Sequence, residues 1–430
     1  MRNICLVMSS VVVSLLVLGG CPKWPAPENH DLFLDPDQSV RPLTLQHDLL
    51  RQVVEDVRFA PLNRVYFQQM LEDTKGEKSL VVNLFDDVTF QVKTATVSEV
   101  SNGIINWKGQ EIHGEPFEIS FMVKEGTIVG RIHTSAGLFR IAPAGEFPWH
   151  AITRINPSQF PEESPTRHPF QESRDMMEMS QEETLSAKLC DSKGPTPGPG
   201  KGPRIQIMVL YTPAVRTASP GIDQEIALAM QELGGAFEGT WFQAFPLLAH
   251  SQEIAYTETN DMNRDLDWVT ADATVAALRN THKADLVVLL TEQGQYCGIG
   301  WSPNPVTAAS EKSGFSVTLR SCLVNMTFSH EIGHNLGMFH DRYVENAPDP
   351  NGYNFGYVNL GARLRSIMAY DRQCTDAGTT CDRVLAYSEP NGLYKGPNGA
   401  GALGSPIGQP KPAHNREVFC RNAGTVSFFR

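Results

Sequence analysis

Hydrophobic and polar residues follow three different patterns along the chain. A largely apolar run covers residues 4–18. Between residues 80 and 142, apolar residues tend to recur at every second position, the period of a half-buried strand. From Ile205 onwards, short apolar runs alternate with stretches in which apolar residues recur every three or four positions, which predicts alternating strands and helices.

The alternating stretch predicts a small β-rich domain over residues 41–156. Lys124-Glu125-Gly126 is expected to form a hairpin turn between two of its strands. Upstream, the four-residue spacing of Leu45, Leu49, Val53 and Val57 predicts a helix. Strands are expected at residues 80–100, 104–107, 117–123, 128–134 and 138–142. The domain contains no cluster of ligand or nucleophile residues.

The second half, residues 204–430, predicts an α/β domain with a twisted, mostly parallel sheet. Strands are expected at residues 205–211, 247–256 and 285–290, and helices at residues 222–237 and 270–279. A last short strand at residues 315–319 is expected at the sheet edge, where it can hold an extended peptide by main-chain pairing.

Composition separates these two domains and limits the partners. The chain has 430 residues, 41% hydrophobic and 20% charged, as in ordinary globular proteins, and its net charge of −12 argues against nucleic acid or an anionic membrane as the main partner. Residues 157–203 are rich in Pro, Glu, Ser and Gly, which predicts a linker open to proteolysis. A domain, a cleavable linker and a hydrolase form the arrangement of a zymogen; the alternative is a plain spacer after a permanent accessory domain.

The N-terminus predicts export from a bacterial cell. Residues 1–20 carry Arg2 and an apolar run too short to span a bilayer, as in a signal peptide. Leu18-Gly19-Gly20-Cys21 resembles a lipobox, so either Cys21 is lipidated and anchors the protein in a membrane, or a signal peptidase cuts nearby and the protein is secreted. Residues 21–40 then form a polar, Pro-rich tether.

Export permits disulfides among the cysteines that follow Cys21. The short loop between Cys374 and Cys381 is the easiest to bridge. Five cysteines follow the linker, an odd number, so Cys190 either pairs with one of them, is inert, or acts as a propeptide thiolate on the metal.

The chemistry is concentrated in residues 329–341, Ser-His-Glu-Ile-Gly-His-Asn-Leu-Gly-Met-Phe-His-Asp. His330 and His334 lie four positions apart, so a helix places both imidazoles on one face as two ligands of one metal ion. Asn325 or Thr327 can cap the start of this helix, and Gly337 can end it in the left-handed conformation. The chain then returns His340 as a third ligand, which leaves the fourth position on a zinc ion open for water.

Several segments together resemble the reprolysin-like metzincins, and most closely the bacterial peptidyl-Asp metalloendopeptidases. Residues 330–341 match the string H-E-x-x-H-x-x-G-x-x-H-D, and Ser366-Ile367-Met368-Ala369-Tyr370 matches the Met-turn. Weaker matches occur in the same order at residues 209–213, 284–287, 297–301 and 426–430.

The resemblance implies a role for each matching residue. His330, His334 and His340 would bind one catalytic zinc ion, Glu331 would be general base and later proton donor, and Met368 would form a hydrophobic floor. Asp341 would orient the backbone near the site. Tyr370 would either stabilise the oxyanion or only form a wall of the pocket. An Asp preference after the scissile bond would need a buried cation, for which Arg363, Arg365 and Arg372 are the candidates by position.

These features predict a monomeric zinc endopeptidase that acts on protein or peptide substrates, with no nucleic-acid partner and with membrane contact only through Cys21. The alternative is an exported, non-catalytic zinc-binding or adhesion protein, against which the presence of Glu331 counts. A metal-dependent hydrolase of non-peptide substrates is a third possibility, which the expected edge strand disfavours.

Overall fold

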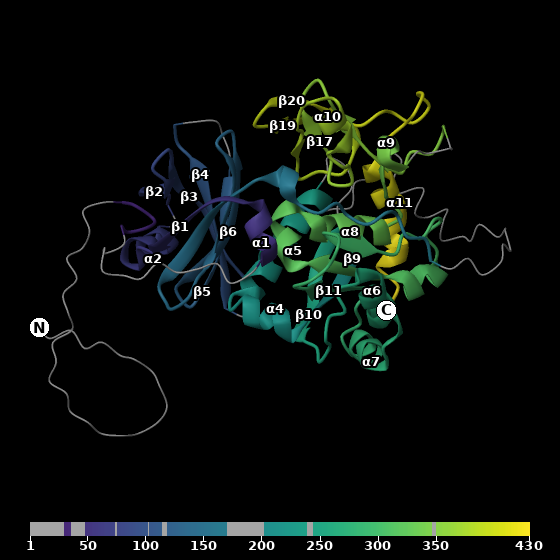
Figure 1. Cartoon of the computed structure of the whole chain (residues 1–430), viewed down its shortest axis with the longest axis horizontal. Coiled ribbons are helices and arrows are strands. Elements are labelled where there is room, and N and C mark those ends of the chain that lie inside the picture. Colours follow the sequence, from purple (N-terminus) through teal and green to yellow (C-terminus); the bar gives the residue numbers. More distant parts are fainter. Residues whose placement is uncertain are drawn as a thin grey trace, which may run out of the picture.

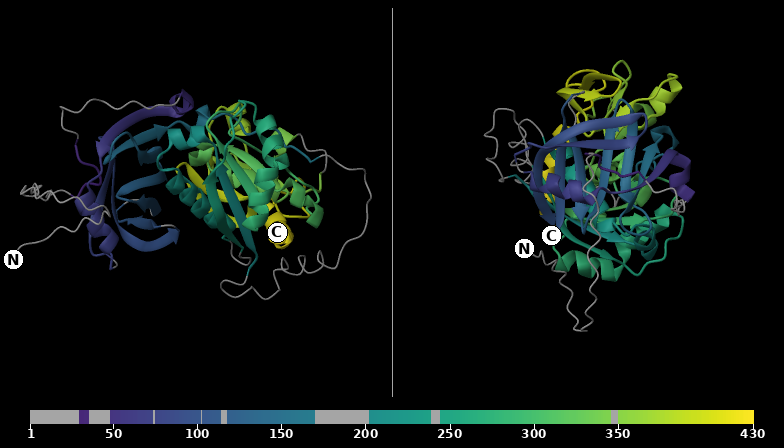
Figure 2. Two further views of the ribbon diagram at one scale, coloured as in Figure 1. Left: turned by 90° about the horizontal axis from the view of Figure 1, so that it is seen from below. Right: turned by 90° about the vertical axis from the view of Figure 1, so that its left-hand side faces the viewer.

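The computed structural model describes residues 30–35, 48–73, 75–101, 103–113, 118–169, 202–238, 244–345 and 350–430. The expected signal peptide, Cys21 and Cys190 lie outside these residues. An N-terminal part and a C-terminal part, each built around its own sheet, lie side by side along the longest axis (Figures 1 and 2). Within the described residues, no helix combines the length and the apolar character needed to cross a bilayer.

The N-terminal part is an eight-stranded antiparallel sheet in the order β1-β8-β7-β6-β5-β4-β3-β2. Helix α2 packs Phe67 and Met70 against one face, where the Phe67 ring lies 5.5 Å from that of Trp107. The elements are α1 (Asp48–Val53), β1 (Val54–Pro61), α2 (Arg64–Glu72), β2 (Ser79–Phe85), β3 (Val88–Ser101), β4 (Ile104–Glu111), β5 (Glu118–Lys124), β6 (Thr127–Thr134), β7 (Gly137–Pro143), β8 (Trp149–Ile155) and η1 (Pro157–Gln159).

Two local predictions in this part have different outcomes. The turn between β5 and β6 is confirmed, because Glu125 and Gly126 both have positive φ, 50° and 77°, as a two-residue hairpin turn requires. The helix predicted through Val57 is wrong beyond Val53. Val57 lies in β1, where pairing with β8 overrides the four-residue apolar spacing.

The C-terminal part is organised by a five-stranded sheet in the order β10-β9-β11-β13-β12, in which only β12 is antiparallel. Alternate residues of β9 and β11 point to opposite faces. One face packs against α5 and α8, and the other against α6 and α7. The main elements are β9 (Arg204–Tyr211), α4 (Pro213–Ala218), α5 (Ile222–Phe237), β10 (Phe245–Glu253), α6 (Met262–Ala271), α7 (Ala273–Thr281), β11 (Leu286–Thr291), β12 (Gly298–Gly300), η2 (Ala308–Ser313), β13 (Phe315–Leu319), η3 (Arg320–Asn325) and α8 (Thr327–Asn335).

Two predictions for this sheet are corrected. Residues 315–319 form an internal strand, β13, which pairs with β11 on one side and β12 on the other, so the edge strand is β12. The helix expected at residues 270–279 is divided, because the side chain of Asp272 accepts hydrogen bonds from the backbone of Thr274 and Val275 and starts α7 there.

The chain after α8 forms short strands and helices that close over the end of the sheet. The disulfide Cys374–Cys381 lies within this segment and is the bridge that the sequence predicted, whereas the disulfide Cys297–Cys322 links the start of β12 to η3, before α8. Cys420 is disulfide-bonded as well. The elements are β14 (Phe339–Asp341), α9 (Arg342–Glu345), β15 (Phe355–Gly356), β16 (Val358–Asn359), β17 (Leu364–Arg365), α10 (Arg372–Asp376), β18 (Asp382–Arg383), β19 (Glu389–Gly396), β20 (Gly399–Leu403) and α11 (Asn415–Val426).

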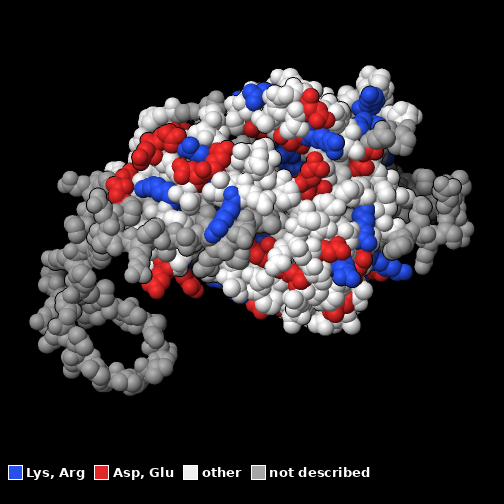
Figure 3. Space-filling model, viewed as in Figure 1, with Lys and Arg blue, Asp and Glu red and all other residues white. Residues whose placement is uncertain are grey.

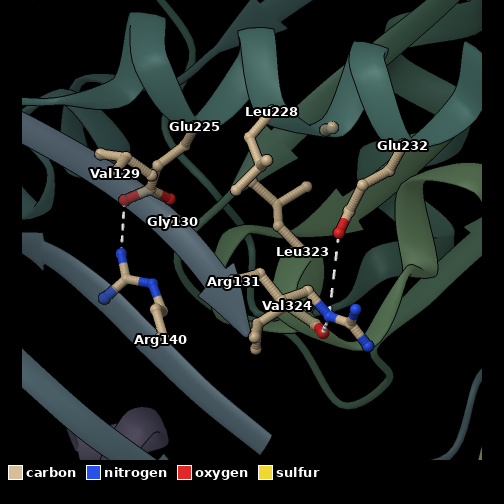
Figure 4. A pocket seen from close by; sticks show the side chains of 10 residues that line it. Val129, Gly130, Arg131, Arg140, Glu225, Leu228, Glu232, Leu323 and Val324 are labelled. Carbon is tan, nitrogen blue, oxygen red and sulfur yellow. Dashed lines mark hydrogen bonds and ion pairs between the residues drawn. The ribbon is translucent and has the colours of Figure 1, made fainter. Parts of the chain in front are cut away.

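Helix α5 joins the two parts through buried ion pairs. Figure 4 shows Arg140 of β7 pointing at Glu225 of α5, with Nη2 2.5 Å from Oε1, and Arg131 of β6 pointing toward Glu232. Arg320 of η3 pairs with Glu225 at 3.3 Å and with Glu292 at 2.7 Å. Burial alone would raise the pKa of Glu225, but Arg140 and Arg320 hold that pKa below its ordinary value.

The surface carries both signs of charge. On the face shown in Figure 3, the described Lys and Arg side chains are scattered among Asp and Glu side chains and do not form one continuous basic field.

Arg320→Met is expected to lower the free energy of unfolding by about 3–5 kcal/mol, because it leaves two buried carboxylates short of a partner. Lys124→Met removes a partly exposed pair with Asp223 at the same helix and should cost less than about 1 kcal/mol. Urea unfolding of the full chain measures both values. Equal losses from the two variants would contradict the assignment of Arg320 as a buried structural cation.

Candidate metal centre and active site

Helix α8 positions the first two histidines. It runs from Thr327 to Asn335, and all of its residues are buried. Neither Asn325 nor Thr327 caps it, contrary to expectation. The N-cap is Met326, whose φ of 62° turns the chain sharply from η3 into α8 without a side-chain cap.

Gly337 returns the third histidine to the helix. Its φ of 84° belongs to the left-handed region, as predicted, and an added Cβ would lie 2.9 Å from the Val306 side chain. The ring centroids of His330, His334 and His340 then lie 4.6–5.1 Å apart.

Hydrogen bonds at Nδ1 fix the orientation of the three rings. His330 Nδ1 lies 2.9 Å from the carbonyl oxygen of Ile367, and His334 Nδ1 lies 2.9 Å from that of Met338. His340 Nδ1 lies 2.7 Å from a carboxylate oxygen of Glu345. In the neutral form of each ring, an N–H at Nδ1 serves this acceptor and Nε2 is left unprotonated.

These Nε2 atoms fit a bound cation. His330 Nε2 is buried without a hydrogen-bond partner among the described residues, and His334 Nε2 lies 2.9 Å from His340 Nε2 with no proton left to share. Burial lowers the pKa of His334 to about 3 and also lowers that of His330, so both rings are neutral. The group His330, His334 and His340 therefore offers three lone pairs that can hold one metal ion.

Glu331 lies next to the three histidines in a space made by glycines. A Cβ on Gly298 would overlap Oε1 of Glu331, and one on Gly300 would lie 3.0 Å from Oε2. Both carboxylate oxygens are buried and have no hydrogen-bond partner within the described part of the chain. Burial, and next the charge of Glu163, raise the pKa of this carboxyl group well above its ordinary value.

The segment around Met368 packs against the helix α8 that carries His330 and His334. A Cβ on Gly333 would overlap the Met368 sulfur, so this side chain lies directly against α8 between the two histidine turns. Asp341 accepts a hydrogen bond from the backbone N–H of Tyr370 at 2.9 Å, which links β14 to this segment. The Tyr370 ring lies 4.5 Å from the His340 ring.

The three arginines singled out from sequence do not contact the histidines. Arg363 donates to the carbonyl oxygen of Thr380, and Arg372 is exposed. Arg365 is buried and donates to the carbonyl oxygens of Cys381 and Ala369.

Sequence reasoning missed Arg383, a buried neighbour of Arg365 in the pairing of β17 with β18. It also missed Glu345 and the two glycines of β12. A carboxylate five residues after His340 was the only local signal for Glu345. The two glycines lie in the weak family match at residues 297–301, which assigned them no role, and nothing local marked Arg383.

Part of the predicted linker lies across this site. Residues 162–168, called the strap below, pair with the edge formed by β12: Cys297 N–H donates to the Glu162 carbonyl oxygen at 3.0 Å, and Ser164 N–H donates to that of Gly298 at 3.0 Å. The Thr166 hydroxyl contacts Glu345 and lies 3.1 Å from His340 Nδ1. The Tyr370 hydroxyl donates to the Glu163 carbonyl oxygen at 2.6 Å.

Known proteins are similar to this chain. A family model described as reprolysin-like, metallopeptidase family M12B, matches residues 238–341. A peptidyl-Asp metalloendopeptidase of Xanthomonas campestris pv. campestris is 26% identical over 374 residues, which cover 83% of this chain and 82% of the relative. One of Stenotrophomonas maltophilia is 26% identical over 327 residues, covering 74% and 72%. Metalloproteinase-II of Bacteroides fragilis superposes with a TM-score of 0.38 at 10% identity, covering 61% and 81%, too weakly to inform the fold.

The family match ends at Asp341 and includes all three histidines and Glu331. The sequence similarity and the buried histidine triad agree on one chemistry. Residues 238–341 are similar to the reprolysin-like metallopeptidases of family M12B, and with the histidine triad this similarity makes the chain a metal-dependent endopeptidase.

Proposed function

We propose that the chain is an exported zinc endopeptidase that prefers aspartate on the C-terminal side of the scissile bond and whose N-terminal domain is a propeptide. The observation that carries the zinc assignment is the convergence of three unprotonated, buried Nε2 atoms beside an unpartnered carboxylate. Neutral imidazoles suit zinc, and three of them leave a position for water.

A zinc ion held by His330, His334 and His340 would polarise the substrate carbonyl and lower the pKa of a water molecule. Glu331 is placed to take the proton of the attacking water and to pass it to the leaving amine. The Tyr370 hydroxyl, which donates to a peptide carbonyl in the strap, can donate to a substrate carbonyl oxygen as negative charge develops there. The edge of β12 can hold the substrate by main-chain pairing once the strap has left.

Export is supported by the disulfides of the C-terminal part, which form in oxidising compartments. The propeptide assignment is supported by the strap, because the chain that leaves the N-terminal sheet crosses the site at residues 162–168. The aspartate preference is supported by the names of the two relatives.

Glu331→Gln is expected to lower peptide turnover by about a hundredfold or more, because the amide cannot accept the proton. Zinc content should stay at one ion per chain, since Glu331 is not among the proposed ligands. Casein hydrolysis and elemental analysis measure the two quantities. Undiminished cleavage by this variant, or cleavage by the wild type that survives a chelator, would refute the proposed mechanism.

Gly298→Ala is expected to lower turnover by about tenfold or more, because the added methyl group displaces Glu331 and small misplacements of a catalytic group are costly. Gly361→Ala is the matched control. Its Cβ would lie 3.6 Å from the nearest side-chain atom, Asn359 Oδ1, in ordinary contact. If Gly298→Ala keeps wild-type turnover in the same peptide assay, Glu331 does not need this space.

The active enzyme is expected to cleave a peptide with Asp after the scissile bond with a kcat/KM about tenfold or more above that of the same peptide with Asn. A charged hydrogen-bond partner discriminates to this extent when it is buried. Fluorogenic peptides that differ at this one position make the comparison. Equal rates would mean that the preference in the relatives' names does not extend to this chain.

A further inference from the structure

The strap lies along the edge strand β12 and is joined to it by backbone hydrogen bonds and one isolated bridge. Its hydrogen bonds run along β12 from Glu162 to Arg167, whose carbonyl oxygen accepts from Ser302 N–H at 2.8 Å, and Arg167 pairs with Trp301 in parallel orientation. The Arg167 guanidinium stacks on the Trp301 ring and pairs with Asp267 at 3.0 Å. The strap thus occupies the main-chain positions that an extended peptide would use.

Within the strap, Glu163 and Ser164 are the buried residues, and Glu163 is the charged one of the two. Its exposed fraction is 5%, whereas Glu162 is exposed. The Glu163 carboxylate lies 2.6 Å from Arg383 Nη1. Burial alone would raise its pKa, but the charge of Arg383 outweighs burial and holds the pKa well below the ordinary value.

Arg383 is fixed between the two segments that frame the centre. Its Nη1 donates to the carbonyl oxygen of Asn325, just before α8, at 2.9 Å, and its Nη2 to that of Ala369, between Met368 and Tyr370, at 3.3 Å. Its Nε is buried without a partner among the described residues. The guanidinium is therefore held rigidly while part of its hydrogen-bonding capacity remains unused.

A second cation lies beside it. Arg365 Nη1 donates to the same Ala369 carbonyl oxygen at 2.7 Å, and Arg365 lies 3.9 Å from Asp371. Burial, and then the nearby charge of Arg383, lower the pKa of Arg365 to about 9. Two buried guanidinium groups thus favour a carboxylate at the position of Glu163.

We infer that Arg383 is the residue that selects substrates with an acidic side chain. In the full chain, the Glu163 side chain occupies the position that this substrate side chain would take. The inference rests on the proposed peptidase function and its acidic preference. Removal of the strap leaves Arg383 buried and without its carboxylate, and a substrate carboxylate restores the pair. An uncharged substrate side chain leaves the cation unpaired, so it binds less well.

The first test compares two full-length variants that are confirmed as uncleaved by mass. Glu163→Gln is expected to raise hydrolysis of the Asp peptide by the uncleaved chain about tenfold or more, because the strap loses its ion pair. Glu162→Gln changes a neighbouring exposed carboxylate and should leave this rate within about twofold of wild type. If Glu163→Gln is no more active than Glu162→Gln, Glu163 does not hold the strap in the site.

The second test adds Arg383→Gln to the Glu163→Gln chain. The ratio of kcat/KM for the Asp peptide over the Asn peptide is expected to fall from about tenfold or more to near one, whatever the common change in rate for the two peptides. Arg383→Lys should keep part of the ratio that Arg383→Gln loses, because lysine retains the positive charge but lacks the planar guanidinium that can donate two hydrogen bonds to one carboxylate. A ratio that survives Arg383→Gln overturns the inference, whereas no preference in the Glu163→Gln chain itself overturns the acidic preference of the proposed function.

A peptide inhibitor provides a measurement that needs no Arg383 variant, should the variants fail to fold. A synthetic peptide of residues 161–168 is expected to inhibit the Glu163→Gln chain about tenfold more strongly than the same peptide with Gln in place of Glu163. The matched peptide with Gln in place of Glu162 should inhibit like the unmodified one. If the unmodified peptide and the one that lacks the Glu163 carboxylate inhibit equally, the inference is overturned.

Discussion

The constraint on which the site depends is the fixed tautomer of three buried imidazoles. Each Nδ1 is bound by an acceptor from a different segment: the Ile367 carbonyl before Met368, the Met338 carbonyl after α8, and the Glu345 carboxylate in α9. The rings then present Nε2 lone pairs to one another in a buried space, which is unfavourable unless a cation lies between them. The loops after α8 are therefore as necessary to the centre as the helix itself.

Glycines surround this centre because other side chains pack into the space that a Cβ atom would occupy at these positions. Gly333 lets Met368 reach the surface of α8, Gly298 and Gly300 leave room for Glu331 beneath β12, and Gly337 provides the left-handed turn to His340. Side chains at these positions would move the sulfur, the carboxylate or the third imidazole. The edge strand proposed to hold a substrate and the wall behind the proposed catalytic base, Glu331, are thus one structure.

What could be predicted from sequence is what depends on local spacing. The four-residue step from His330 to His334, the glycine at 337 and the short loop between Cys374 and Cys381 act over a few residues, and the structure has each as expected. The position of β13 inside the sheet, the three-residue edge strand β12 and the approach of Arg383 to Arg365 depend on pairing between distant segments. Periodicity cannot supply strand order or register.

The strap shows how a segment with the composition of a linker can adopt a defined conformation. Its Pro, Glu and Ser residues bury little apolar area, but hydrogen bonds to β12, the buried pair of Glu163 with Arg383 and the stacking of Arg167 on Trp301 replace a hydrophobic core. Just before it, Phe160 packs against both the N-terminal sheet and the Cys297–Cys322 disulfide. The strap is therefore held at both ends independently of the chain that follows it. Because it is tethered next to the site, its effective concentration there is high, and it competes well with a free peptide for binding along β12. A cut between residues 169 and 202 would leave both attachments in place, so on the propeptide proposal activation requires that the N-terminal sheet also separate from α5.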